Sequence, residues 1–205
     1  ALEAMAKLAD IVGATDDRAR FTTTLTQMRA AFDAQFWNET TASYAAHSLH
    51  TQTLNALALV SNAPSESHRA AATASLVADV EARGDHLTVG STGAPHLLQA
   101  LTDSGHHDVA LRLALQETWP SWGFWLTGNE TLGVSGGTCW ESWLGDDTHN
   151  HIFLCGGLGE WMYSSLAGIV PTGPGYSRVR IAPQISKTEG PDSVNASVHT
   201  VRGVV

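Results

Sequence analysis

Residues 86–118 read HLTVGSTGAPHLLQALTDSGHHDVALRLALQET, and this stretch decides the fold class. In residues 93–101 and again in residues 108–118, apolar side chains recur every three to four positions, as they do in amphipathic helices. Gly105 lies between the two runs, where a tight turn needs a flexible residue. The stretch therefore predicts a pair of antiparallel helices.

The same periodicity continues on both sides of this pair. It predicts helices over residues 2–12, 15–37, 51–60, 64–84 and 152–169. Phe21, Leu25, Met28, Phe32 and Phe36 form one apolar stripe on the second of these helices. The spacing matches none of the fixed periods of TPR, ankyrin or HEAT arrays. Helical hairpins of unequal length occur in solenoids and in closed toroids, and we favour a toroid.

After Pro171 the pattern changes from helical to alternating. Residues 176–182 read YSRVRIA, and residues 193–205 alternate again, which predicts strands. We therefore expect two domains, a helical one at residues 1–170 and the start of a β-domain at 171–205. The sequence begins inside an apparent helix and stops inside an apparent strand, so we expect it to be a portion or a cleavage product of a longer polypeptide.

Charge and hydropathy exclude two classes of partner. Eleven basic residues against twenty acidic ones give a net charge of −9, which makes nucleic acid an unsuitable partner. No apolar run approaches the roughly 20 residues that a bilayer span requires, so we expect no membrane span.

Cellular location depends on weaker signals. Cys139 and Cys155 can form one disulfide or none, which leaves the redox compartment open. Possible N-glycosylation sequons begin at Asn38, Asn129 and Asn195, in stretches that we read as loop or exposed strand. These sequons favour a secreted or extracellular glycoprotein, although a Thr-rich chain also produces them by chance.

Six of the seven tryptophans lie between Gln116 and Trp161. An indole face can stack on the apolar face of a sugar ring while nearby carboxylates and imidazoles bind its hydroxyl groups. Tryptophan also buries a large area in ordinary cores. The cluster therefore fits either a carbohydrate cleft or a Trp-rich core.

Three segments together resemble glycoside hydrolase family 78, the α-L-rhamnosidases. They are QETWPSWGF, TCWESW and HNHIFLCGGLGEWMYSSLAGI, and their order and spacing also match that family. The segments TQTLNALAL, residues 86–118 and GYSRVRIAPQ extend the resemblance over nearly the whole chain.

The resemblance implies part of an (α/α)6 toroid, followed by the first strands of a β-sandwich. It implies an enzyme that removes terminal α-L-rhamnose from glycosides or polysaccharides with inversion, without cofactor or metal. Glu141 matches the general base, and His151 matches a cleft histidine that binds a sugar hydroxyl. The aromatic residues that the resemblance assigns to the sugar site are Trp119, Trp122, Trp140 and Trp143.

The resemblance also implies that the general acid lies in the other half of the toroid, outside these residues. We therefore expect this chain alone to be nearly inactive and to need that half, from the same polypeptide or an associated chain. His149 and His151 lack a carboxylate or cysteine at metal-ligand spacing, which argues against a metal site. The competing interpretations are another (α/α)6 hydrolase or lyase, and a non-catalytic carbohydrate-binding or structural glycoprotein.

Overall fold

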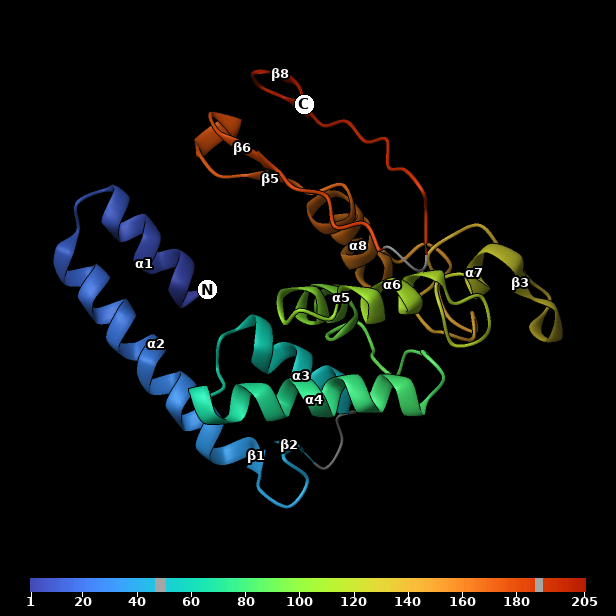
Figure 1. Cartoon of the computed structure of the whole chain (residues 1–205), viewed down its shortest axis with the longest axis horizontal. Coiled ribbons are helices and arrows are strands. Elements are labelled where there is room, and N and C mark those ends of the chain that lie inside the picture. Colours follow the sequence, from blue (N-terminus) through green and yellow to red (C-terminus); the bar gives the residue numbers. More distant parts are fainter. Residues whose placement is uncertain (47–50, 187–189) are drawn as a thin grey trace.

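The computed structural model describes residues 1–46, 51–186 and 190–205 as a mainly helical protein (Figure 1). The predicted mainly helical fold class is therefore confirmed. The α-helices are α1 (Leu2–Ile11), α2 (Thr15–Phe36), α3 (Thr51–Val60), α4 (Glu66–Ala82), α5 (Ala94–Asp103), α6 (His107–Leu115), the single turn α7 (Phe124–Thr127) and α8 (Ile152–Trp161).

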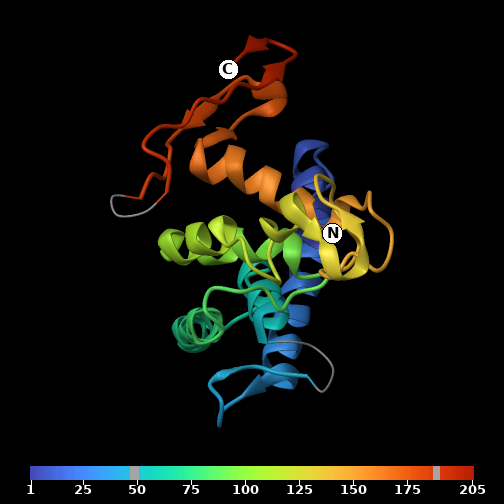
Figure 2. The same ribbon diagram turned by 90° about the vertical axis from the view of Figure 1, so that its right-hand side faces the viewer.

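Successive helices pack as hairpins, α1 with α2, α3 with α4 and α5 with α6. Helix α5 also packs against α3 on one side and α8 on the other, so α3, α5 and α8 form one layer. Figure 2 shows α8 above α5 and α3 below it. The loops after α6 and before α8 gather at one end of the layer (Figure 1).

The core lies between the helices of these hairpins, where buried leucines come from each of α3 to α6 and α8. Two amides of α3 are buried with them and hold loops in place. Gln52 donates from Nε2 to the His86 carbonyl (3.0 Å) and accepts from the Thr88 N–H (2.8 Å). Asn55 accepts from the Tyr44 N–H at 3.1 Å. Because a buried amide is stable only with partners, these bonds fix both loops on the helical layer.

Helix α8 approaches α5 closely because residue 157 is glycine. A Cβ atom at this position would lie 2.4 Å from the Cα atom of Pro95, at the start of α5. At Gly159, which is exposed on another face of α8, an added Cβ meets nothing within 4 Å. Of these two glycines of α8, only Gly157 is required for helix packing.

We expect Gly157→Ala to lower the free energy of unfolding by about 1–3 kcal/mol, because the backbone of α5 must move to admit the methyl group. Gly159→Ala is the matched control and should be neutral or stabilising, since alanine is the better helix former. Urea denaturation of the two variants measures the difference. Equal losses in both would show that the α5 contact does not set the requirement for glycine.

Three helical features differ from the sequence-based expectation. Helix α6 ends at Leu115, because Gln116 is extended and its side chain accepts from the N–H groups of Glu117 and Thr118. The last predicted helix is α-helical only to Trp161 and then widens into a π-helical turn, Met162–Leu166. The apolar stripe predicted on α2 is only partly buried. Phe32 and Phe36 pack against the core, whereas Met28 is 58% exposed, and no residue of α2, all of which is described, is fully buried.

The described strands are short and pair antiparallel, two at a time. They are β1 (Trp37–Asn38) with β2 (Ser43–Tyr44), β3 (Gly128–Asn129) with β4 (Val134–Ser135), β5 (Ile169–Pro171) with β6 (Val179–Ile181), and β7 (His199–Thr200) with β8 (Gly203–Val204). Strands β6 to β8 lie where alternation predicts strands, beyond the far end of α8 (Figure 1). The predicted domain boundary after residue 170 stays a prediction. Strand β5 extends across this position. Within the described residues, no helix is both long and apolar enough to cross a bilayer.

Candidate active site

Residues 139–151 form a loop that folds back on itself and that we name the carboxylate loop. Its two arms are joined by backbone hydrogen bonds. The N–H of Glu141 donates to the Thr148 carbonyl (2.9 Å), and the N–H of His151 donates to the Cys139 carbonyl (2.7 Å). The side chains of Glu141 and His151 therefore come from facing arms of one short loop.

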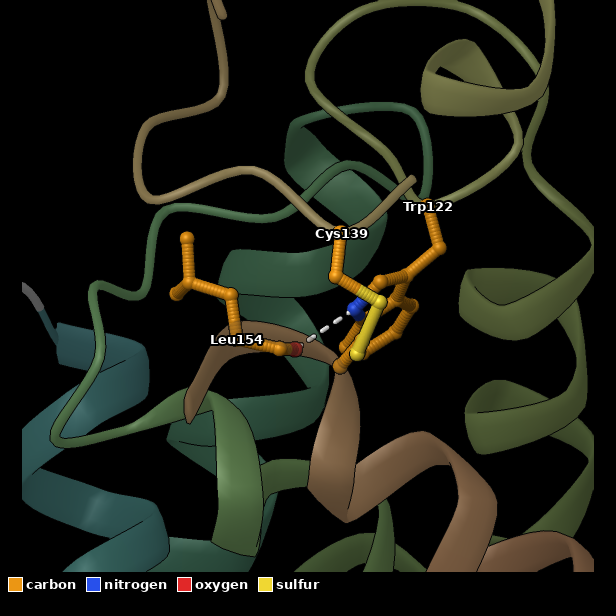
Figure 3. Close-up of a disulfide and its surroundings, with 4 residues drawn as sticks. Trp122, Cys139 and Leu154 are labelled. Atoms are coloured by element: carbon orange, nitrogen blue, oxygen red, sulfur yellow. Dashed lines mark hydrogen bonds between the residues drawn. A yellow bond between two sulfur atoms is a disulfide. The ribbon is translucent and has the colours of Figure 1, made fainter. Parts of the chain in front are cut away.

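A disulfide between Cys139 and Cys155 attaches the carboxylate loop to the first turn of α8 (Figure 3). Beside it, the indole N–H of Trp122 donates to the Leu154 carbonyl at 2.7 Å (Figure 3). Trp122 is only 5% exposed, so this bond is shielded from water. One covalent bond and one buried hydrogen bond thus hold the start of α8 against the two segments that precede it.

Each carboxylate oxygen of Glu141 faces a different side chain. The Thr148 hydroxyl donates to Oε2 at 2.7 Å. Oε1 lies 3.8 Å from Nε2 of His151, which is beyond hydrogen-bond range. An oxygen atom of a water or a sugar about 2.8 Å from both would fit between them. The Glu141 side chain is 39% exposed, so this position can be reached from solvent.

Two tryptophans of the carboxylate loop, Trp140 and Trp143, pack against Trp125. Trp143 is half-buried, and its indole N–H donates to the Val89 carbonyl at 2.6 Å. Trp125 lies beneath it in a stacked contact with 4.7 Å between ring centroids. Trp140 is fully buried and packs against Gly145, whose positive φ of 76° also favours glycine. The loop therefore rests on an aromatic base.

A hollow of about 730 Å³ opens next to Trp143. Trp119 forms part of its wall and is 50% exposed, which leaves an indole face free for a ligand. The polar lining includes Arg83, His86 and Thr88, from the segment that Gln52 holds in place. Exposed aromatic surface combined with hydrogen-bonding groups suits a polar ligand with an apolar face, such as a sugar.

The structure brings some predicted site residues together and buries others in the protein core. Glu141 and His151 face each other, and Trp119 and Trp143 line one hollow. Trp122 and Trp140 are buried instead, so their faces are covered by protein and they support the site from below.

Two contributors to the site were not predicted. Thr148 lies three residues before His151 and binds Glu141, but nothing in the pattern distinguishes it from the chain's many other threonines. Trp125 belongs to the tryptophan cluster, yet its position under Trp143 depends on tertiary packing.

One predicted glycosylation site needs correction. Asn129 is 7% exposed, and its amide nitrogen donates to the Leu144 carbonyl at 2.7 Å. Its Oδ1 accepts from the Leu132 N–H, so the side chain caps a turn rather than projecting from a loop. The expectation that Asn129 lies in an exposed stretch is therefore wrong. Asn38 and Asn195 are exposed, and their glycosylation stays a prediction.

Sequence comparison gives consistent matches. A family model described as the bacterial α-L-rhamnosidase six-hairpin glycosidase domain matches residues 1–166. An α-L-rhamnosidase of Streptomyces avermitilis is 38% identical over 179 residues, which cover 82% of this chain and 16% of that protein.

Solved structures agree with the sequence matches. The crystal structure of the Streptomyces avermitilis α-L-rhamnosidase complexed with L-rhamnose superposes with a TM-score of 0.76 at 30% identity, over 97% of this chain and 19% of that one. The α-L-rhamnosidase of Dictyoglumus thermophilum gives a TM-score of 0.81 at 26% identity, over 99% of this chain and 22% of that one. The chain thus spans between 16% and 22% of the length of these relatives.

Proposed function

Because the chain belongs to the bacterial α-L-rhamnosidase family of six-hairpin glycosidases, we propose that the protein containing it removes terminal α-L-rhamnose from glycosides or polysaccharides. The proposed reaction is an inverting hydrolysis with two carboxylic acids, in which Glu141 is the general base. The observation that carries the proposal is the partly exposed Glu141 carboxylate, which Thr148 orients and which faces His151. Glu141 lies two residues before Trp143, which lines the hollow together with Trp119.

In the proposed step, a water molecule attacks the anomeric carbon of rhamnose. Its oxygen forms the new bond to that carbon while one of its protons passes to Oε1 of Glu141. The glycosidic C–O bond breaks at the same time, and the leaving oxygen receives a proton from the general acid. The two carboxyl groups of an inverting enzyme stand roughly 6.5–9.5 Å apart, which leaves room for the water.

The general acid is proposed to come from the other half of the toroid. Support comes from the surface of α8, where Ile152 is 70% and Phe153 58% exposed. Apolar side chains on this helix would be covered if further hairpins continued the layer of α3, α5 and α8. The partner would be the rest of the same polypeptide or an associated chain.

A disulfide and two exposed sequons support a secreted or extracellular location as part of the proposal. Disulfides persist in oxidising compartments and are rare in the cytosol. Mass spectrometry of the protein from its native source would detect glycans at Asn38 and Asn195, and their absence would remove the glycoprotein part of the proposal.

The test is hydrolysis of p-nitrophenyl α-L-rhamnoside by the intact protein, followed by proton NMR. We expect release of rhamnose, with the β-anomer appearing first because the mechanism inverts. Initial release of the α-anomer would overturn inversion. Rhamnose binding without turnover would instead support the alternative, a non-catalytic carbohydrate-binding or structural glycoprotein with the same toroid.

Trp119 is proposed to stack on the sugar or on the group attached to it. Trp119→Ala should raise KM for the aryl rhamnoside about three- to tenfold, because aromatic stacking contributes roughly 0.5–1.5 kcal/mol beyond area burial. Leu126→Ala is the control, since Leu126 is 77% exposed on the same segment. If KM responds equally to both changes, or to neither, Trp119 does not contact the substrate.

A further inference from the structure

The contact between Thr148 and Glu141 differs from the other contacts of that carboxylate. The hydroxyl of Thr148 donates to Oε2 at 2.7 Å, within the usual range for a hydroxyl bound to a carboxylate. The imidazole of His151, by contrast, lies 3.8 Å from Oε1 and makes no direct hydrogen bond. The carboxylate is therefore held at one oxygen and open at the other.

Thr148 is itself held by its backbone. Its carbonyl accepts from the N–H of Glu141 at 2.9 Å, and its own N–H donates to Oδ1 of Asp147 at 3.0 Å. Glu141 and Thr148 are thus joined by one backbone hydrogen bond and by one side-chain hydrogen bond. Below them, the hydrogen bond from His151 to Cys139 and the disulfide close the base of the loop.

Without the hydroxyl, the Glu141 side chain would be free to rotate. It is 39% exposed and has three rotatable bonds, and a flexible side chain of this kind samples several rotamers. A general base must meet the water in one orientation, because proton transfer requires hydrogen-bond reach in the reacting complex. A single donor at Oε2 selects the rotamer in which Oε1 faces His151.

We propose that Thr148 is a positioning residue for the reaction: its hydroxyl fixes Oε2 of Glu141 so that Oε1 receives the proton from the attacking water. This inference rests on the proposed function, in which Glu141 is the base. A hydroxyl is required at this position, but the methyl group of threonine is not. Serine should therefore replace Thr148, whereas valine, which has the same shape and no donor, should not.

The experiment compares Thr148→Val, Thr148→Ser and Thr148→Ala in the intact protein, with p-nitrophenyl α-L-rhamnoside as substrate. We expect Thr148→Val and Thr148→Ala to lower kcat about tenfold or more, the scale of one hydrogen bond to a charged group, with KM within about twofold of wild type. Thr148→Ser should restore kcat to within about threefold of wild type. The matched control is Thr138→Val, which removes a hydroxyl from an exposed threonine just before the loop and should leave both constants unchanged.

The outcomes separate failure of this inference from failure of the proposed function. An unchanged kcat in Thr148→Val, or a serine variant as slow as the valine variant, would overturn the positioning role. Either result leaves the proposed function standing if Glu141→Gln is inactive. A fully active Glu141→Gln would instead remove the part of the proposed function on which this inference rests, the assignment of Glu141 as the base. Thermal unfolding checks that each variant is folded, and Thr148→Ala replaces Thr148→Val if the valine variant is not.

Discussion

Glu141→Gln should lower kcat of the intact protein for an aryl α-L-rhamnoside by roughly 10²–10⁴-fold, the usual contribution of a general base. Glutamine keeps the shape of the side chain and can still accept from the Thr148 hydroxyl, but it cannot take a proton from water. KM should change little, because the substitution removes a function that is needed only in the transition state.

The control for this variant is Glu130→Gln, at an exposed carboxylate on the same segment. It should retain full activity, because Glu130 is exposed in the short 3-10 helix Glu130–Leu132 and has no role in the proposed site. Thermal unfolding of both variants should match wild type. Turnover in Glu141→Gln close to that of wild type would contradict the assignment of the base.

Removing the disulfide should have the largest effect on stability. The bond closes a loop with a sequence separation of 16 residues. Chain-entropy arguments give about 3 kcal/mol for a closed loop of roughly 15 residues. We therefore expect the double variant Cys139→Ser, Cys155→Ser to lose about 3 kcal/mol in the free energy of unfolding, measured with urea.

Activity should fall together with stability, because both arms of the carboxylate loop depend on this attachment. Wild-type protein treated with dithiothreitol should behave as the double variant does, which provides the control. A loss below about 1 kcal/mol, or a reduced wild type as stable as the oxidised form, would show that the hydrogen bond from Trp122 to Leu154 holds α8 without help.

Most helices could be predicted from the sequence because the residues of each helix and of its flanking turns specify where it begins and ends. Apolar periodicity, glycines between the runs and the turn residues gave α1 to α6 to within a few residues. The errors lie where tertiary contacts decide. The α2 stripe is a correct helical pattern, yet its burial depends on what packs against it, which periodicity does not specify.

The site was predicted less completely than the fold. A tryptophan has the same sequence signature whether its ring is buried, as in Trp140, or half exposed, as in Trp119. The pairing of Cys139 with Cys155 remained open because spacing alone does not define a disulfide. Thr148 could not be identified because its hydroxyl becomes important only when the loop folds back and brings it to Glu141.

The disulfide places Glu141, Thr148 and His151 on one covalent ring that closes between residues 139 and 155. Asp146 and Asp147 lie in an exposed part of that ring. A single proteolytic cut there would open the backbone without releasing either piece, because the ring would become two arms joined through sulfur. The nicked protein would keep its carboxylate and histidine on tethered strands, and only the combination of a cut and a reductant would separate them.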